Sequence, residues 1–115
     1  MKIVNLETFL NSPKGTIFQK WEPNIFEPLC IFENSCGNNE DFLYREFRGN
    51  VEFPEEHANY GTIQYYKKEI PNMENLYVDF NCVERDGCFD HQQMFAIYEK
   101  KDLKEMIQIL QNNLS

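Results

Sequence analysis

The sequence predicts an α+β protein: a small antiparallel sheet of four to five strands, with a short N-terminal helix and a C-terminal amphipathic helix packed on one face. Three observations lead to this fold class. Short segments of alternating apolar and polar residues occupy the middle of the chain, helical spacing of apolar residues is confined to its two ends, and turn residues separate the segments. Strands grouped apart from helices are typical of α+β rather than α/β proteins. With 115 residues, the chain fits one domain, residues 1–115.

The N-terminal part of the chain predicts a helix followed by a strand. Asn5 is expected to cap a short helix that carries Leu6, Phe9 and Leu10, because an Asn side chain accepts a hydrogen bond from the free amides of the first turn. A turn containing proline and glycine then ends this helix. Residues 16–21 alternate between two faces, with Phe18 and Lys20 on the same one, and therefore predict a strand.

The middle of the chain has a weaker pattern. Residues 29–32 form a short apolar segment typical of a strand, and residues 34–39 are a polar loop that contains glycine. Residues 41–47 fit either a strand or a single helical turn, because periodicity does not discriminate between these for short apolar runs. Residues 54–70 are also open between helix and strand. Pro54 suits a helix start, whereas the β-branched and aromatic residues that follow favour a strand.

The last third of the chain carries the clearest pattern. Residues 76–83 and 93–99 are expected to be two strands of a hairpin, flanking a loop at residues 84–91 that contains an Asp-Gly turn. A helix over residues 101–112 follows at once. Its apolar stripe consists of Leu103, Met106, Ile107 and Leu110, which recur at helical spacing.

The charge of the chain limits the partners that it can bind. Nineteen acidic residues against eleven basic ones give a net charge of −8, and the basic residues are dispersed. Proteins that bind nucleic acid or anionic membranes need clustered lysine and arginine, so neither partner is expected. An acidic surface instead steers encounters with a basic surface on another protein. We find no signal peptide and no apolar run long enough to cross a bilayer, so we expect a cytoplasmic protein.

Four cysteines stand in two pairs with the same spacing: Cys30 with Cys36, and Cys82 with Cys88. Structural zinc sites usually place paired ligands roughly two to four residues apart, so the wider spacing here argues against a metal and we expect none. In a reducing compartment the thiols are expected to be free. The sequence alone does not decide whether the four cysteines bind a metal.

The loop at residues 84–91 concentrates chemical side chains but matches no catalytic motif. Cys88 lies three residues before His91, yet the neighbouring acids Asp86 and Asp90 disfavour a thiolate. The Asp-Gly pair is what a turn requires, because both residues tolerate positive φ. The sequence contains no phosphate-binding glycine loop, nucleophile elbow or zinc-protease signature. We therefore expect no catalytic residues and no cofactor, and a small enzyme that uses this loop is the third alternative.

Aromatic residues outnumber what one small core needs, which suggests a binding surface. Tyrosine and tryptophan are enriched at binding hot spots because each combines a large apolar area with a polar end. For a protein partner, the expected contact residues are Tyr44, Tyr65, Tyr66, Asp86 and Asp90. For a small anionic ligand, the alternative residues are Arg45, Arg48 and Arg85, whose guanidinium groups would hold phosphate while aromatic rings stack on a base.

Three stretches carry a resemblance to known sequences. They are Leu6…Phe9-Leu10-x-x-Pro13-x-Gly15-Thr16-x-Phe18, Pro28-Leu29-Cys30-Ile31, and Arg85-Asp86-Gly87-x-Phe89-Asp90…Met94-Phe95-Ala96-Ile97-Tyr98-Glu99. On these stretches the chain resembles small uncharacterised proteins encoded by phages and prophages. The resemblance implies no activity and no catalytic residues. It does imply a context, because phage genes of this size often encode inhibitors of host defence, such as anti-CRISPR proteins or sponges that sequester signalling nucleotides.

The leading hypothesis from the sequence is a non-enzymatic binding protein. In this hypothesis the chain resembles a phage accessory factor and acts in the cytoplasm of the host cell. It inhibits a host defence protein by occupying a basic surface of that protein. The alternative is an oligomeric sponge that binds a signalling nucleotide. The identity of the partner or ligand and the oligomeric state do not follow from the sequence.

Overall fold

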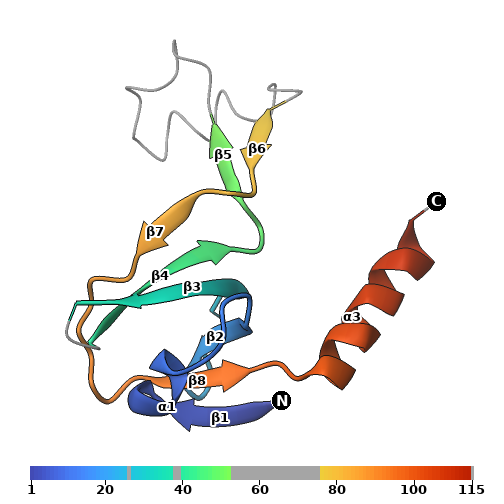
Figure 1. Ribbon diagram of the computed structural model, residues 1–115. Coiled ribbons are helices and arrows are strands. Elements are labelled where there is room, and N and C mark those ends of the chain that lie inside the picture. Colours follow the sequence, from blue (N-terminus) through green and yellow to red (C-terminus); the bar gives the residue numbers. More distant parts are fainter. Residues whose placement is uncertain (26, 38–39, 53–75, 115) are drawn as a thin grey trace.

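The computed structural model describes residues 1–25, 27–37, 40–52 and 76–114. The helices and strands in these ranges, labelled in Figure 1, are β1 (Lys2–Asn5), α1 (Leu6–Leu10), β2 (Ile17–Trp21), β3 (Cys30–Cys36), β4 (Asp41–Glu46), β5 (Asn50–Glu52), β6 (Tyr77–Asp79), β7 (Val83–Arg85), β8 (Met94–Ile97) and α3 (Lys100–Asn113). Neither of the two described helices is both long and apolar enough to cross a bilayer.

Six strands form one antiparallel sheet in the order β1-β8-β2-β3-β4-β7, and β5 and β6 pair separately. β8 lies between β1 and β2, with Val4 opposite Phe95 and Phe18 opposite Ile97. The register between β3 and β4 shifts after Phe32, which marks a bulge. Figure 1 shows the strands stacked from β1 at the bottom towards β7, with the β5–β6 pair continuing upwards as a separate arm.

Helix α1 supplies the centre of the core on one side of the sheet, which we call the front face. The side chain of Asn5 accepts a hydrogen bond from the backbone N–H of Thr8 at 2.9 Å, and this confirms the predicted cap. Phe9 is 0% exposed. Its ring has four aromatic neighbours with centroids 4.0 to 5.1 Å away: Phe18, Phe32, Phe42 and Phe95. A helix of this length is unstable alone, so packing of the rings holds it in place.

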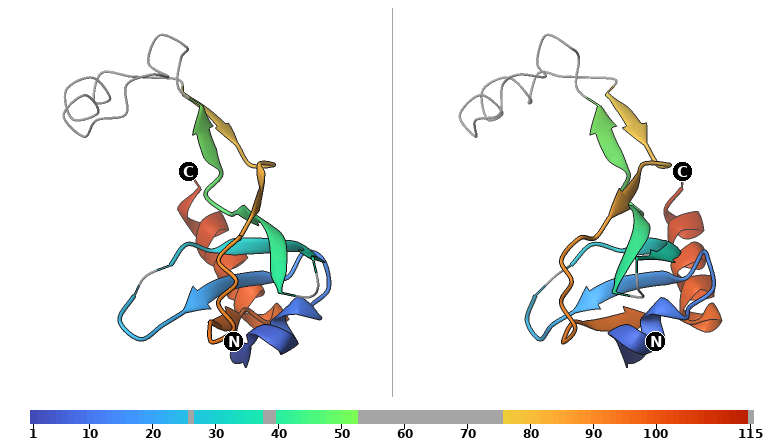
Figure 2. Two further views of the ribbon diagram at one scale, coloured as in Figure 1. Left: turned by 90° about the vertical axis from the view of Figure 1, so that its left-hand side faces the viewer. Right: turned by 60° about the vertical axis from the view of Figure 1, so that its left-hand side comes forward.

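Helix α3 lies beside the opposite side of the sheet, which we call the back face. Ile17 and Leu29 border the helix, and along the chain they alternate with Phe18 and Cys30, which belong to the front-face core. None of the residues of α3 is buried. The two views of Figure 2 show α3 rising beside the sheet as a separate element. The C-terminal helix therefore packs less closely on the sheet than the sequence predicts. It also lies beside the back face, whereas both helices were predicted on one face.

The fold class is confirmed, and the number of strands is larger than expected. Residues 17–21 and 94–97 form strands as predicted, and both terminal helices are present. Residues 2–5 add a strand that the sequence analysis missed. Residues 41–46 form a strand rather than a helical turn, and β3 extends through residues 34–36, where a loop was predicted.

The predicted hairpin between residues 76–83 and 93–99 is wrong. The first segment contains β6, which pairs with β5, and only the first residue of β7, which continues to Arg85 in the predicted loop and pairs with β4. β8 lies three strands away from β4 in the order of the sheet, between β1 and β2. The side chain of Asp79 accepts a hydrogen bond from the backbone N–H of Asn81 at 2.8 Å, which closes a local turn and ends the first strand. Residues 54–70 lie outside the described residues.

Candidate functional site

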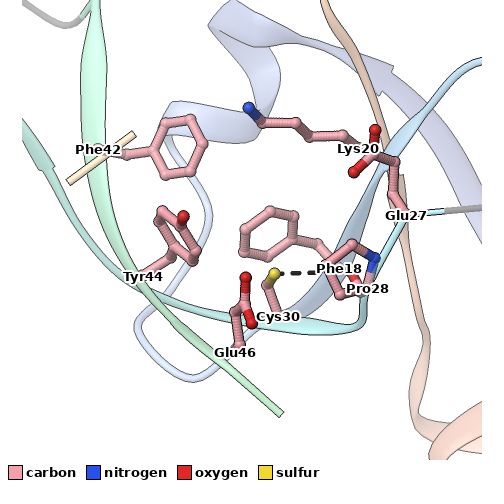
Figure 3. Close-up of a pocket in the computed structure, with 8 residues that line it drawn as sticks. All are labelled: Phe18, Lys20, Glu27, Pro28, Cys30, Phe42, Tyr44 and Glu46. Atoms are coloured by element: carbon pink, nitrogen blue, oxygen red, sulfur yellow. Dashed lines mark hydrogen bonds between the residues drawn. The ribbon is translucent and has the colours of Figure 1, made fainter. Parts of the chain in front are cut away.

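On the front face, strands β2, β3 and β4 enclose a pocket of about 90 Å³, which we call the front pocket. Its lining, drawn in Figure 3, consists of Phe18, Lys20, Glu27, Pro28, Cys30, Phe42, Tyr44 and Glu46. Three aromatic rings and two carboxylates therefore surround one small space. Figure 3 shows these side chains arranged around it from the strands and from the segment that precedes β3.

Strand alternation explains why these side chains gather. Residues two apart in a strand point to the same face of the sheet, so Phe42, Tyr44 and Glu46 follow one another along β4 on the front face. Cys30 of β3 lies opposite Glu46 and also opposite Phe18 of β2. The pocket thus forms where three neighbouring strands present the same face.

Lys20 forms one wall of the front pocket and is held by the loop that follows β7. Its Nζ lies 2.5 Å from Oδ1 of Asp86 and 3.8 Å from Sγ of Cys88. Burial alone would lower the pKa of Lys20, but the hydrogen bond and charge of Asp86 outweigh burial and raise it. Lys20 therefore stays protonated at neutral pH, and its charge is balanced by Asp86. A protonated amine cannot serve as a base or a nucleophile.

Tyr44 of β4 lines the pocket and is paired with Glu84 of the neighbouring edge strand β7. Its hydroxyl donates a hydrogen bond to Oε2 of Glu84 at 3.2 Å. Burial, followed by the neighbouring Glu84 carboxylate, raises the pKa of Tyr44 above its usual range. The Tyr44 phenol therefore stays neutral. Its hydrogen bond holds the negatively charged Glu84 carboxylate close to the pocket.

Glu27 and Glu46 place two carboxylates in the lining of the front pocket. Nε of Arg48 lies 2.7 Å from Oε2 of Glu46, but the Arg48 side chain is 73% exposed. An exposed ion pair of this kind contributes only about 0 to 1 kcal/mol. Within the described ranges, no lysine or arginine forms an ion pair with Glu27. Of the two carboxylates in the lining, Glu46 therefore has an exposed arginine partner, and Glu27 has no ion pair with a described lysine or arginine.

Cys30 lies at the base of the front pocket. Its Sγ is 3.6 Å from the carbonyl oxygen of Pro28. Burial, followed by the charge of Glu46, raises the pKa of the Cys30 thiol to about 12. The thiolate is the nucleophile in cysteine chemistry, so a thiol with this pKa is inert at neutral pH.

The loop that carries Asp86 is fixed by Asp41, a buried carboxylate at the start of β4. Oδ1 of Asp41 accepts a hydrogen bond from the backbone N–H of Gly87 at 2.8 Å, and Oδ2 accepts one from Arg85. Gly87 has a φ of 67°, as expected for the Asp-Gly turn. Asp41 therefore determines where Asp86 meets Lys20.

The three arginines of the predicted ligand site do not come together. Arg45 pairs with Glu33, and it also donates hydrogen bonds to the Phe80 carbonyl and the Asn81 side chain at 3.3 and 3.2 Å. Arg85 pairs with Asp41, and its guanidinium lies 5.5 Å from the centroid of the Phe89 ring. With Arg48 on Glu46, each arginine is paired with a carboxylate of the chain itself. They do not form a shared phosphate site.

The five residues predicted to contact a protein partner have different positions. Tyr44 and Asp86 both lie at the front pocket, Tyr44 in its lining and Asp86 on Lys20. Asp90 is exposed, and its side chain accepts a hydrogen bond from the backbone N–H of Gln92 at 3.0 Å. Tyr65 and Tyr66 lie outside the described residues.

Three charged residues of the front pocket were not predicted from the sequence. Glu46 could have been found by its spacing from Tyr44, because the two residues share a face if residues 41–47 form a strand. Lys20 was placed on the face of Phe18, but nothing local indicates its contact with Asp86. Glu27 carries no signal, because it precedes a strand in an irregular segment.

Cys88 and His91, which lie three residues apart in sequence, have different neighbours in the structure. The polar neighbours of the Cys88 sulfur are Lys20 and the carbonyl oxygen of Asp86. His91 instead borders a shallow depression of about 430 Å³ beside α1, together with Asn5 and Glu7. All four cysteines lie in the described part of the chain and are free thiols. In that part, no group of three or more His, Cys, Asp or Glu side chains is placed to hold a metal ion.

Comparison with known proteins gives no relative from which a role could be transferred. No protein-family model, curated protein or solved structure matches the chain. The front pocket and the charge of the molecule are therefore the features that bear on its function.

Proposed function

We propose that this chain is a non-enzymatic binding protein that occupies a basic surface of a partner protein, with the front pocket receiving a lysine or arginine side chain. The observation that carries the proposal is the composition of the pocket. Rings of Phe18, Phe42 and Tyr44 and carboxylates of Glu27 and Glu46 line a single small cavity. Aromatic faces and carboxylates are the two groups that attract an ammonium or guanidinium ion.

The size of the front pocket favours a side chain over a free metabolite. Pockets for drug-sized ligands usually measure roughly 300 to 1,000 Å³. The front pocket measures about 90 Å³, which is too small for a nucleotide. The separate positions of Arg45 and Arg85 also give no support to the nucleotide sponge.

The charge of the whole chain favours the same kind of partner. A net charge of −8 speeds encounter with a positively charged surface and repels acidic ones. Lys20 also lines the pocket, and its ion pair with Asp86 offsets part of its positive charge. The resemblance to phage accessory proteins implies that the partner is a host defence protein in the cytoplasm of the infected cell.

The pocket can be tested with small probes that mimic the two basic side chains. We expect butylammonium and guanidinium chloride to cause saturable NMR shifts of the backbone amides of Tyr44 and Glu46, with millimolar dissociation constants. Butanol, which has the same apolar chain as butylammonium but no charge, serves as the matched probe and should give no saturable shift. Glu46→Gln should abolish the response to both cations, whereas Glu22→Gln, which removes an exposed acid outside the pocket, should leave it unchanged.

A second experiment connects the pocket to a protein partner. Wild-type protein and the same two variants are used to retain proteins from a host extract, and the retained proteins are identified by mass spectrometry. We expect a protein with a basic surface to be retained by wild type and by Glu22→Gln, and to be lost with Glu46→Gln. The proposal is overturned if neither cation binds, or if the retained proteins are the same for all three samples.

A further inference from the structure

Among the described residues that line the front pocket, Lys20 alone is basic. Figure 3 draws its side chain around the same small space as the carboxylates of Glu27 and Glu46. The Lys20 ammonium is the same kind of cation that the pocket is proposed to receive from a partner. Lys20 is therefore a competitor, within the chain itself, for the site of a partner's lysine or arginine.

Asp86 holds the Lys20 ammonium apart from the carboxylates of the pocket. Nζ of Lys20 lies 2.5 Å from Oδ1 of Asp86, which is outside the lining. Among the described residues, Lys20 forms no ion pair with Glu27 or Glu46. The Asp86 side chain is only 9% exposed, so water and salt screen its pair with Lys20 less than they screen the exposed pair of Arg48 with Glu46.

The position of Asp86 is fixed by contacts other than Lys20. Its second carboxylate oxygen, Oδ2, accepts a hydrogen bond from the backbone N–H of Cys88 at 3.3 Å. The residues before and after Asp86 both donate hydrogen bonds to the buried carboxylate of Asp41. In contrast, the amine of a lysine lies at the end of a flexible four-carbon stem. Of the two partners in this ion pair, Lys20 is therefore the one that can move.

Without the charge of Asp86, the Lys20 ammonium has a second carboxylate within reach. Burial lowers the pKa of Lys20, whereas Asp86 raises it and Glu27 raises it further, so the Glu27 carboxylate already acts on the ammonium. A partly buried ammonium that loses its counter-charge is costly, and this cost is relieved by a new ion pair. A Lys20 side chain that turns from Asp86 to Glu27 fills the pocket with a cation of the chain itself.

We infer, on the basis of the proposed function, that Asp86 keeps the front pocket available to a partner's cation by restraining Lys20. Asp86 lies outside the lining and does not touch the bound cation, so it is a positioning residue that acts through Lys20. The buried Asp41 contributes to the same restraint, because it fixes the loop that carries Asp86. The loop after β7 therefore controls a pocket that is built by β2, β3 and β4.

Butylammonium titrations of variants test this role, with the NMR shifts of the backbone amides of Tyr44 and Glu46 as the readout. Asp86→Asn keeps an oxygen acceptor but removes the charge. It should raise the dissociation constant of butylammonium about tenfold, because Lys20 then occupies the pocket in about nine of ten molecules. Lys20→Met combined with Asp86→Asn removes the competitor and should restore at least the wild-type affinity. Asp79→Asn removes the same charge from a residue of β6 that also accepts a backbone hydrogen bond, and it should leave the dissociation constant unchanged.

Three results would overturn this role of Asp86 while the proposed function stands. The first is an Asp86→Asn variant that binds butylammonium as tightly as wild type. The second is a double variant that binds as weakly as Asp86→Asn, because Asp86 would then support the shape of the loop without restraining Lys20. The third is a loss of affinity in Lys20→Met alone, which should bind at least as tightly as wild type. If wild type gives no saturable shift, the proposed function fails, and the role of Asp86 fails with it.

Discussion

Asp41 shows how one buried charge is compensated in a small protein. The residue is 0% exposed, and three donors surround its carboxylate: the Arg85 guanidinium and the backbone N–H groups of Gly87 and Phe42. Burial alone would raise the pKa of Asp41, but these hydrogen bonds outweigh burial and lower it. The carboxylate is therefore charged at neutral pH, and it links β4 to the edge strand β7.

We expect Asp41→Ala to lower the free energy of unfolding by about 3 kcal/mol, because three hydrogen bonds to a buried, charged acceptor are lost and the buried N–H of Phe42 is left without a partner. Equilibrium unfolding in urea measures this difference. Glu40→Ala removes an exposed acid at the preceding position and should change the free energy of unfolding by no more than about 0.5 kcal/mol. Equal losses for the two variants would show that the buried carboxylate does not hold β7 in place.

Helix α1 buries Leu6, Phe9 and Leu10, and Phe9 is the one whose ring lies at the centre of the aromatic core. The Phe9 ring contacts four other rings of the front face, and the Phe95 ring lies stacked against it at a centroid distance of 4.0 Å. Truncation of such a ring removes apolar contacts and leaves a cavity that the strands cannot fill.

Phe9→Ala is therefore expected to lower the free energy of unfolding by about 4 kcal/mol, measured by urea denaturation. The matched control is Phe80→Ala, which truncates the same kind of ring at a position that is 57% exposed and should cost less than about 1 kcal/mol. If Phe9→Ala is as stable as the control, then α1 does not organise the core.

Elements defined by local pattern could be predicted from the sequence, and pairings between distant segments could not. β2 and β8 each lie within one run of strand-forming residues, and the α1 cap needs only Asn5 and the next three residues. In contrast, residues 76–83 alternate without interruption in sequence, yet the turn after Asp79 divides them between two sheets. Alternation shows which face a residue occupies, but it does not show which strand lies next to it.

The same limit applies to the front pocket. Tyr44 was predicted as a contact residue because the aromatics exceed what the core needs, and Asp86 because the chain is acidic. The structure places Tyr44 in the lining of the front pocket and Asp86 on Lys20, which lines the same pocket. Lys20 and Glu46 become neighbours only when β2, β3 and β4 pair in the observed register. No single segment of the sequence contains this information, because strand order is decided by packing of the whole sheet.

The ion pairs among the described residues make the stability of the molecule depend on pH. The pKa values of Asp41, Glu33 and Asp102 are all lowered in the folded state. For Glu33, burial would raise the pKa, but the hydrogen bonds and charges of Arg45 and Lys14 outweigh burial and lower it. For Asp102, the Met1 amine is the main cause. A carboxylate with a lowered pKa in the folded state stabilises the protein above its unfolded pKa of about 4, and this contribution is lost as the pH falls through that value towards the folded pKa. The pKa values of Lys20 and the Met1 amine are raised in the folded state. Each group therefore contributes its full stabilisation below its pKa in the unfolded chain, which is about 8 for the amine and higher for Lys20, and this stabilisation is lost only as the pH rises further.

We therefore expect a stability plateau between about pH 5 and pH 8, followed by a steep loss below about pH 4. Repulsion among the acids acts in the opposite direction, because protonation towards the isoelectric point of about 4.7 relieves it. At 0.15 M salt this repulsion is screened beyond about 8 Å, whereas the buried or close pairs are screened much less, so the loss of the pairs should dominate. Urea unfolding from pH 2 to pH 8 at this ionic strength measures the profile. Asp41→Asn removes the carboxyl group at this position and should make the fall of the free energy of unfolding below about pH 4 less steep. A free energy of unfolding that stays constant from pH 7 to pH 3 in the wild-type protein would contradict the role given to the ion pairs of Asp41, Glu33 and Asp102.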